Sequence, residues 1–419
     1  MKPVPSLVCC VLAGITSIGG ALPAFAQSAS PVPRSAPEAA VSIAQAVEAA
    51  WLRAVEAREA DAQAVRARAD QVAASSLSAG PPALELSHLD DRLHSNAGRR
   101  ETEVGIAWPL WLPGQRDARR ATADAALRMA DLQFDVMRLR LAGQVHEAAW
   151  KLAAAQAESQ AYGTQRQYLQ RIADDVQRRV GAGDLARSDA LVARAELLEA
   201  ESAEIEAAQR RAALRLQWRS LTGLEALPAM PSPAMPSADP PEGGTHPELR
   251  LAMQAVEHAQ RKLDAVNVSR RDAPELSVKY RQEAPGLGER LQRGVGVGIR
   301  IPFGTDGRNA PLQAAAIGEL DVADTNAQRL RDRLDADLQT ARTAARDAAR
   351  QLASTRERAT LLRERAELVE ISFKAGETPL PDLLRAANAA TQADAALARQ
   401  QAALGLAQAR LQQASGRFP

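Results

Sequence analysis

Residues 293–303 read Arg-Gly-Val-Gly-Val-Gly-Ile-Arg-Ile-Pro-Phe and alternate strictly between apolar and small or charged side chains as far as Ile301. Successive side chains of a β-strand point to opposite faces, so this stretch predicts a strand with one apolar face. A strand of about nine to eleven residues with that sidedness matches an outer-membrane β-barrel. A small sheet packed on helices would show the same pattern. The apolar face comprises Val295, Val297, Ile299, Ile301 and Phe303.

The same stretch has a second copy earlier in the chain, at an offset of 193 residues. Two other features recur at the same offset: a glycine-containing turn followed by an aspartate, and a single proline. Three unrelated anchors at one offset predict a duplicated unit. The anchors are Val104-Gly105-Ile106-Ala107-Trp108-Pro109 with Val297-Gly298-Ile299-Arg300-Ile301-Pro302, Ala182-Gly183-Asp184 and the following Asp189-Ala190-Leu191 with Ala375-Gly376-Glu377 and the following Asp382-Leu383-Leu384, and Pro81 with Pro274.

Each repeat is predicted to contain a helix, two strands, a very long helix, a turn and a second helix. A proline-rich segment, residues 224–246, separates the repeats and is too rich in proline for a helix. The first repeat, 27–223, is assigned a helix over 38–78, strands at about 82–90 and 101–111, a long helix over 114–180 and a helix over 187–221. The second, 247–419, is assigned a helix over 247–270, strands at about 274–282 and 293–303, a long helix over 311–374 and a helix over 381–413.

The two long helices set the fold class. Each would have about 65 residues, which at 1.5 Å per residue gives roughly 100 Å. That length exceeds a compact globular domain, and alanine on their apolar stripes suits close side-by-side packing. The sequence therefore predicts a mainly α protein with a small β part.

The N-terminus has the features of a secretory signal peptide, residues 1–26. Lys2 precedes an apolar run from Leu7 to about Leu22, and Ala24-Phe25-Ala26 supplies a small-residue cleavage site before Gln27. The two cysteines, Cys9 and Cys10, lie inside this stretch. The mature chain would then have no disulfide, thiolate metal site or lipid-anchored cysteine.

Composition excludes several function classes. The chain has 52 Lys and Arg against 51 Asp and Glu, so charge gives no reason to expect a nucleic-acid partner. Aromatic residues make up 3% and the mean hydropathy is −0.27, which disfavours a bundle of transmembrane helices. The sequence contains no nucleophile elbow, zinc-protease or Walker motif, which indicates that the protein is not an enzyme and needs no cofactor.

Two local patterns could suggest a phosphate-binding or a metal-binding site, and both are better explained without a ligand. Gly294-x-Gly296-x-Gly298 resembles a phosphate loop but has the wrong spacing and lies within a strand. A loop between the first two strands is predicted to be solvated, although its side chains include possible metal ligands. Those side chains are His88, Asp90, Asp91 and His94.

The signal peptide, matched halves, paired strands, long helices and Ala-Gly-x5-Asp turns together resemble the TolC family of outer-membrane efflux channels. The resemblance implies a homotrimer in which four strands per chain form one twelve-stranded barrel, because four strands cannot close in lipid. It also implies that the helices form a periplasmic tunnel, which meets an adaptor and an inner-membrane pump. The Trp-Leu-Pro-Gly-Gln-Arg run at 111–116 is most similar to the heavy-metal cation efflux subgroup.

The resemblance also implies a gate at the tunnel mouth. Asp189 and Asp382 follow Gly183 and Gly376 by six residues. The family pattern places a second aspartate three residues after the later one, where this chain has Arg385, so an Asp–Arg pair replaces a purely acidic gate. Alternatively, each aspartate is only a helix-start carboxylate favoured by the helix dipole.

Other candidate site residues follow from the same expectation. Glycines at the tips permit sharp reversals that dock an adaptor, apolar strand residues face lipid, and aromatics stand where the barrel leaves the bilayer. Packing at the strand–helix bend is the alternative for the aromatics. The tip glycines are Gly181, Gly183 and Gly376; the lipid-facing residues are Val104, Ile106, Val295, Val297, Ile299 and Ile301; the interfacial aromatics are Trp108, Trp111 and Phe303.

These features predict a passive exit duct through the outer membrane, with its helices in the periplasm of a Gram-negative cell. Its cargo would be delivered by the pump and adaptor, with heavy-metal cations as one candidate. Drug efflux and type I protein secretion are alternative uses of such a duct. A periplasmic coiled-coil adaptor or scaffold is another class, which the two matched strand pairs disfavour.

Overall fold

The computed structural model describes residues 41–228, 230, 246–303 and 306–417. All of them belong to one compact unit, Ala40–Pro419. The predicted signal peptide and most of the predicted linker, 231–245, lie outside the described residues. In the part of the chain that is described, no helix is both long and apolar enough to cross a membrane.

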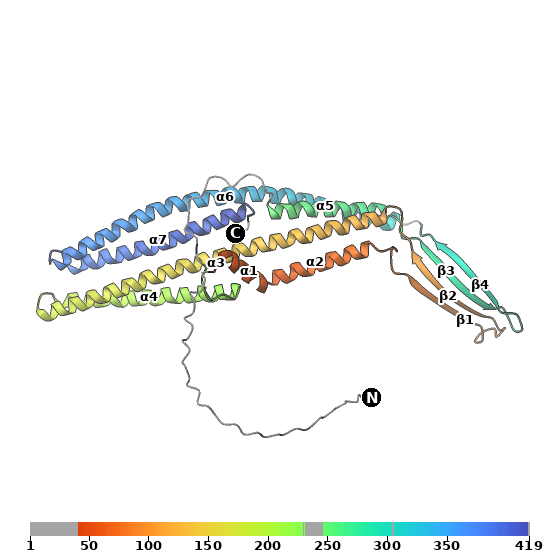
Figure 1. Ribbon diagram of the computed structural model, residues 1–419, viewed down its shortest axis with the longest axis horizontal. Coiled ribbons are helices and arrows are strands. Elements are labelled where there is room, and N and C mark those ends of the chain that lie inside the picture. Colours follow the sequence, from red (N-terminus) through yellow and green to blue (C-terminus); the bar gives the residue numbers. More distant parts are fainter. Residues whose placement is uncertain (1–40, 229, 231–245, 304–305, 418–419) are drawn as a thin grey trace, which may run out of the picture. The chain divides into compact units, whose positions relative to one another are not determined.

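The described chain is mainly helical with one four-stranded sheet, which confirms the predicted fold class (Figure 1). Both repeats run from helix through two strands to a long helix and a final helix, except that the first repeat begins with two helices and the second with one. The helices are α1 (Ile43–Arg53), α2 (Val55–Ala74), α3 (Gln115–Ala182), α4 (Arg187–Thr222), α5 (Pro247–Val268), α6 (Asp306–Lys374) and α7 (Leu380–Ala414). The strands are β1 (Ala83–Asp90), β2 (Arg100–Pro109), β3 (Glu275–Ala284) and β4 (Gln292–Arg300).

The sheet joins the two repeats. Its order is β1-β2-β3-β4 and every neighbouring pair is antiparallel. β2 of the first repeat pairs with β3 of the second, with Trp108 opposite Leu276. β4 ends at Arg300, because Pro302 has no N–H to donate to a ladder.

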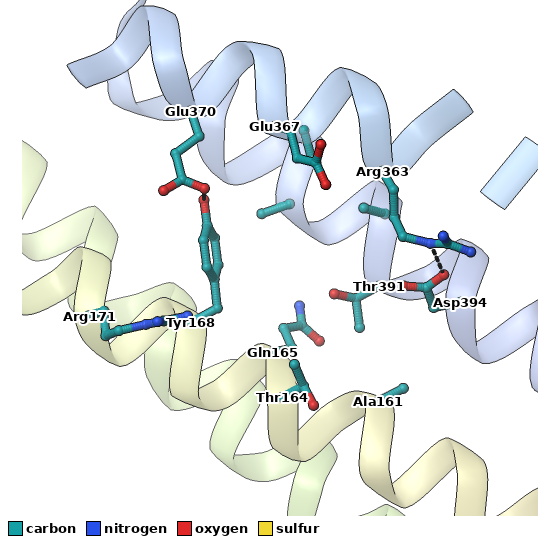
Figure 2. Close-up of a pocket in the computed structure, with 13 residues that line it drawn as sticks. Ala161, Thr164, Gln165, Tyr168, Arg171, Arg363, Glu367, Glu370, Thr391 and Asp394 are labelled. Carbon is teal, nitrogen blue, oxygen red and sulfur yellow. Dashed lines mark hydrogen bonds and ion pairs between the residues drawn. The ribbon is translucent and has the colours of Figure 1, made fainter. Parts of the chain in front are cut away.

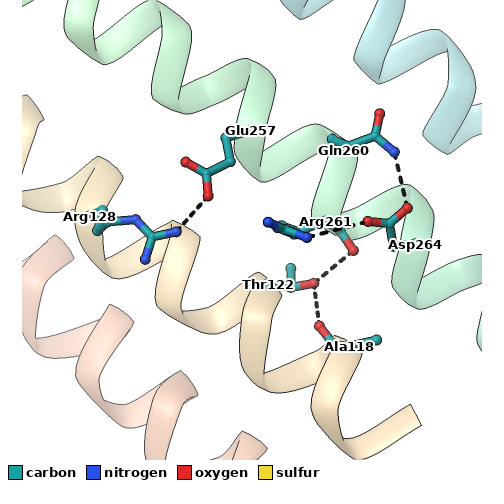
Figure 3. A network of polar contacts seen from close by, with 7 residues as sticks. All are labelled: Ala118, Thr122, Arg128, Glu257, Gln260, Arg261 and Asp264. Atoms are coloured by element: carbon teal, nitrogen blue, oxygen red, sulfur yellow. Dashed lines mark hydrogen bonds and ion pairs between the residues drawn. The ribbon is translucent and has the colours of Figure 1, made fainter. Parts of the chain in front are cut away.

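The long helices also join the repeats. α3 packs against α4 within its own repeat and against α5 and α7 of the other, while α6 packs against α5 and α7. Polar contacts hold α3 to α5: Arg128 donates to Glu257 at 2.7 Å, and the Thr122 hydroxyl to the Arg261 carbonyl at 3.0 Å (Figure 3). The two repeats therefore form one continuous unit.

The 193-residue duplication extends to the helix ends. Gly223 ends α4 with φ of 75°, and Gly416, which follows α7, has φ of 71°. This left-handed conformation is available to glycine at little cost. The backbone duplication thus continues beyond the segments whose sequences are visibly similar.

Two helices differ from the sequence prediction. A single helix is predicted over 38–78, whereas the structure divides it at Ala54, whose φ of −69° and ψ of 140° are extended. α6 is predicted to start at Pro311 but starts at Asp306 and runs through that proline. Alanine favours helix in the first case and proline disfavours it in the second, so local preference is overridden in both.

Of the three clusters of buried residues in the described chain, the two largest lie at different levels of the helices. One cluster surrounds Trp218 and Val145, where α1 and α2 meet α3 and α4. The other surrounds Leu197 and Leu383, close to the two helical turns. The second cluster holds both helical hairpins together near their tips.

Candidate channel elements: the sheet and the helix tips

One face of the sheet carries an apolar band that runs across its strands. Because the strands pair in register, Leu84, Ile106, Val278 and Val297 form one row across all four strands. A second row consists of Leu86, Val104, Tyr280 and Val295. Val295 and Val297 are 73% and 71% exposed, so nothing in the described chain covers this face. An exposed apolar surface of this kind marks contact with a membrane or a partner.

The opposite face of the sheet is polar. Lys279 Nζ lies 2.8 Å from Glu85 Oε2, and an Arg281 guanidinium nitrogen lies 2.7 Å from Glu101 Oε1. Gly105 lies beside Lys279, where an added Cβ would come within 2.8 Å of the lysine Cγ. Gly294 and Gly296 have open space instead. The predicted alternation along β4 therefore separates two chemically distinct faces of the whole sheet.

The β1–β2 loop is held by internal hydrogen bonds. Asp91 accepts from the Ser95 hydroxyl at 2.9 Å and from the Ala97 N–H at 2.7 Å, and His88 Nδ1 lies 2.9 Å from the Thr102 hydroxyl. No group of three or more His, Cys, Asp or Glu side chains suited to a metal occurs among the residues described. Asp91 thus stabilises the loop through its own hydrogen bonds.

The three aromatics predicted to lie at the membrane interface occupy different surroundings. Trp108 shares the apolar face with Leu276 and Ile299 and is half-exposed, while Phe303 is 91% exposed. Trp111 lies beyond β2, where its indole N–H donates to the Ser76 carbonyl at 3.0 Å. Trp111 therefore packs at the bend between strand and helix.

The two helical tips have the same backbone. Gly183 and Gly376 adopt φ of 88° and 82°. After each helix two N–H groups bond back to the last turn: Asp184 to Arg179 and Gly183 to Val180 at the first tip. Glu377 to Ser372 and Gly376 to Phe373 repeat the pattern at the second. This is the Schellman motif, which requires the left-handed residue that glycine supplies. Gly181 lies within the last turn of α3 and has no positive φ.

The predicted gate residues lie in the first turns after the tips. Asp382 and Arg385 form an ion pair, with side chains 46% and 75% exposed. The residue three positions after Asp189 is Val192, so the first tip cannot form the same pair. Neither aspartate caps its helix through a side-chain hydrogen bond, since the N-cap residues are Ala186 and Pro379. Any contribution to helix start is through the dipole alone.

A buried apolar cluster joins the two tips. Leu197 of α4 and Leu383 of α7 are fully buried in it, together with Val176 of α3. The Arg179 guanidinium lies 5.2 Å from the centre of the Phe373 ring, a cation–π contact between α3 and α6. The tips of one chain are therefore a single packed structure.

Polar contacts between the hairpins lie next to this cluster, on the side away from the turns. They border a groove of about 390 Å³ (Figure 2). The Tyr168 hydroxyl of α3 donates to Glu370 of α6 at 3.1 Å. The Gln165 amide donates to Asn388 at 2.8 Å, and the Asn388 amide donates to Glu196 at 2.8 Å. These contacts link α3, α4, α6 and α7, and no sequence motif indicates them.

The Tyr168–Glu370 contact changes the pKa of both groups. Burial, and then the negative charge of Glu370, raise the pKa of Tyr168 well above its usual value. Burial raises the pKa of Glu370, but hydrogen bonds from Lys374 and Tyr168 outweigh it and lower that pKa. The pair is therefore a neutral phenol donating to a charged carboxylate at neutral pH.

Comparisons with known proteins find a family match for the first part of the chain and a shared fold for nearly all of it. Residues 39–224 match the family model described as outer membrane efflux protein. No curated protein matches the chain. CusC, studied for its folding and transmembrane channel formation, has a TM-score of 0.74 at 15% identity, covering 94% of this chain and 99% of its own.

Two further channel structures have the same fold. The Campylobacter jejuni CmeC outer membrane channel has a TM-score of 0.72 at 15% identity, covering 89% of this chain and 85% of its own. The open state of the Neisseria gonorrhoeae MtrE outer membrane channel has a TM-score of 0.71 at 17% identity, covering 90% and 89%. Nearly the whole chain shares the fold of these channels, and residues 39–224 match the outer membrane efflux protein family. Its members are transport proteins of the Gram-negative outer membrane and not enzymes.

Proposed function

We propose that the protein is the outer-membrane duct of a tripartite efflux system and works as a homotrimer. Its cargo would be delivered by an inner-membrane pump through a periplasmic adaptor. The observation that carries this proposal is the four-stranded sheet, whose exposed apolar face suits lipid and whose opposite face is polar. Both outer strands, β1 and β4, have one unpaired edge in the chain, which lipid does not tolerate.

A trimer would pair the free edge of β1 and the free edge of β4 at the same time. Joining β4 of one copy to β1 of the next would close twelve strands into a barrel, with the apolar rows facing lipid. The helices would continue the duct into the periplasm. The duct itself needs no energy source, since the pump would supply it.

The sidedness of the sheet gives the test. Val297→Arg should cost about 2–4 kcal/mol near the bilayer midplane and reduce the amount of trimer extracted from outer membranes. Gly296→Ser, on the polar face with open space around it, is the matched control and should assemble normally. Equal loss of trimer in both variants would contradict the assignment of the two faces.

The tips and the Asp382–Arg385 pair are proposed as the periplasmic mouth. Three copies of the pair around one opening would hold it closed, and the turns at Gly183 and Gly376 would meet the adaptor. The support is the matched geometry of the two turns at the end of about 100 Å of helix.

Heavy-metal cations are the cargo that we propose to test first. The support is the resemblance of residues 111–116 to the heavy-metal subgroup. Deleting the gene should sensitise cells to Zn²⁺ or Cd²⁺ while leaving sensitivity to large antibiotics unchanged. Sensitisation to antibiotics alone would favour a drug-efflux duct.

A further inference from the structure

The apolar band of the sheet ends in a polar row, at the end of the strands that carries the β1–β2 and β3–β4 loops. Residues paired in register across the four strands form this row, two positions beyond the apolar row of Tyr280 and Val295. Residues two positions apart on a strand point to the same face. The polar row therefore shares the face of the apolar band. Its members are His88, Thr102, Gln282 and Arg293.

At this end of the face, the strand positions carry more arginine than carboxylate. Arg293 is exposed and forms no ion pair in the part of the chain that the structure describes. Two positions further out, Arg100 lies opposite Asp90, and its Nε is 3.9 Å from Asp90 Oδ2. Arg92 Nε, from the β1–β2 loop, is 3.4 Å from the same oxygen. Because Asp90 is shared between two guanidinium groups, this end of the face keeps a net positive charge.

The opposite face has the reverse balance at the same level. Guanidinium nitrogens of Arg281 lie 2.7 Å from Glu101, 3.8 Å from Glu103 and 3.0 Å from Glu283. Arg99 shares Glu101 and Glu283 with Arg281. Two arginines thus meet three carboxylates there, and an approaching anion would be repelled. An anion would instead be attracted to Arg293, on the face with the apolar band.

Under the proposed function, this level of the sheet coincides with the headgroups of the outer leaflet. The apolar band would face lipid and the helices would lie in the periplasm, so the loops would point out of the cell. Tyr280 lies in the last apolar row and Arg293 just beyond it. Both side chain types favour the boundary between hydrocarbon and headgroups. Lipid headgroups would therefore contact the polar row.

The spacing of the arginines indicates a headgroup with two phosphates. Neighbouring strands are about 4.8 Å apart, so Arg293 on β4 and Arg100 on β2 lie on strands roughly 10 Å apart, with β3 between them. A guanidinium group binds one phosphate through two parallel hydrogen bonds. Gln282 lies on the intervening strand, and its amide can donate to a sugar hydroxyl or a phosphate oxygen. A glycolipid with two phosphates would engage both arginines at once.

We infer that Arg293 and Arg100 bind the phosphate groups of a bisphosphorylated glycolipid in the outer leaflet, with Gln282 as a hydrogen-bond donor between them. The inference rests on the proposed function and names the lipid that the barrel would select. A twelve-stranded barrel would repeat the site three times around its rim. The bound headgroups would fix the depth of the barrel in the membrane.

Lipid binding to the purified trimer tests the site. Native mass spectrometry would count the lipids retained when the trimer is titrated with lipid A that carries two phosphates, or with the same lipid after both phosphates are removed. The bisphosphorylated lipid should bind at least about tenfold more tightly, because removing the phosphates removes charged hydrogen bonds. Arg293→Gln should abolish most of this preference, and Arg293→Gln with Arg100→Gln should abolish all of it.

Arg281→Gln is the matched control, because it removes the same charge at the same level from the opposite face. This variant should keep the preference for the bisphosphorylated lipid. Arg293→Lys keeps the charge but not the two parallel hydrogen bonds, so it should keep only part of the preference. Since Arg293 is exposed and unpaired, its variants should form trimers in wild-type amounts.

Three results would overturn the inference and leave the proposed function standing. The first is a wild-type trimer that binds the two lipids equally well. The second is an equal loss of preference in Arg281→Gln and Arg293→Gln, which would reflect total charge instead of a site. The third is displacement of the lipid by inorganic phosphate at equal concentration, which would indicate a site for free anions. Absence of a trimer from wild-type outer membranes would instead overturn the proposed function.

Discussion

The two helical tips have the same backbone and different side chains. Both turns use a left-handed glycine and the same pair of backbone hydrogen bonds. In the first turn of the following helix, the second tip has the Asp382–Arg385 pair, whereas the first has Asp189 and the apolar Val192. The duplication has therefore kept the element that shapes the turn and changed the side chains that face its surroundings. Under the proposed function, both tips would stabilise the mouth and only the second would close it.

The shared core of the tips gives the largest expected effect. Leu197→Ala and Leu383→Ala should each lower the free energy of unfolding by about 2–5 kcal/mol, because both leave a cavity in the cluster that joins the hairpins. Thermal unfolding followed by circular dichroism would measure it. The double variant should deviate from additivity, since both side chains belong to one cluster. A large effect at one site only would mean that the tips are not equally supported.

The next largest loss of stability is expected at the two turns, and it should be the same at both. Gly183→Ala and Gly376→Ala should each cost about 1–2 kcal/mol, because an alanine Cβ clashes with the backbone at positive φ. Gly181→Ala is the matched control and should be neutral or slightly stabilising, since that residue is helical and has open space. If Gly181→Ala destabilised as much as Gly183→Ala, the assigned turn geometry would be incorrect.

The third largest effect is expected at the Tyr168–Glu370 hydrogen bond, which links the two repeats and has no counterpart related by the duplication. Tyr168→Phe should cost about 1 kcal/mol at neutral pH by removing the hydrogen bond to Glu370. Because the pKa of Tyr168 is raised in the folded state, its contribution is complete below the ordinary tyrosine pKa of 10.0 and is lost as pH rises above it. The difference in the free energy of unfolding between wild type and variant should therefore be present at pH 8 and should shrink at pH 11. A gap that stayed constant would indicate that the phenol does not titrate with folding.

Substitutions in the proposed gate pair should have the smallest effect on stability and the clearest effect on function. Both side chains are substantially exposed, so an Asp382→Ala or Arg385→Ala change should cost less than about 1 kcal/mol of stability. Each should nevertheless raise single-channel conductance in bilayers, because removing one partner leaves like charges crowded around the opening.

Asp189→Ala serves as the matched variant on the first tip and should leave conductance unchanged. A conductance rise with Asp189→Ala equal to that with Asp382→Ala would erase the proposed division of roles. No change in any of the three variants would reduce Asp382 to a residue that favours helix start.

The sequence predicts the fold well wherever one physical signal dominates. Alternation along 293–303 and its copy at 104–109 indicates the strands, and three-to-four spacing indicates the long helices. The 193-residue offset anticipates the equivalence of the two turns, because glycine at positive φ is a local requirement. These features depend on residues that are close in sequence.

The features that the sequence does not reveal depend on tertiary packing. Ala54 interrupts a run of good helix formers between the buried residues Trp51 and Ala57, and α6 continues through the exposed Pro311. Local preference indicates neither feature. Tyr168 meets Glu370 across 202 positions, and neither residue belongs to a motif. The Asp382–Arg385 pair is visible from its spacing, whereas its exposure is visible only in the structure.

The glycines of β4 have a consequence for the size and charge of the proposed duct. Gly294 and Gly296 place no side chains on the polar face and have open space above them. If that face lines the duct, each copy would contribute a strand segment that has no side chains pointing into the duct. Three such segments in a trimer would widen the bore at that level. The neighbouring strands carry paired charges of opposite sign, such as Lys279 with Glu85. A wide bore with a charge-balanced wall would conduct anions and cations with little preference, leaving the choice of cargo to the proteins upstream.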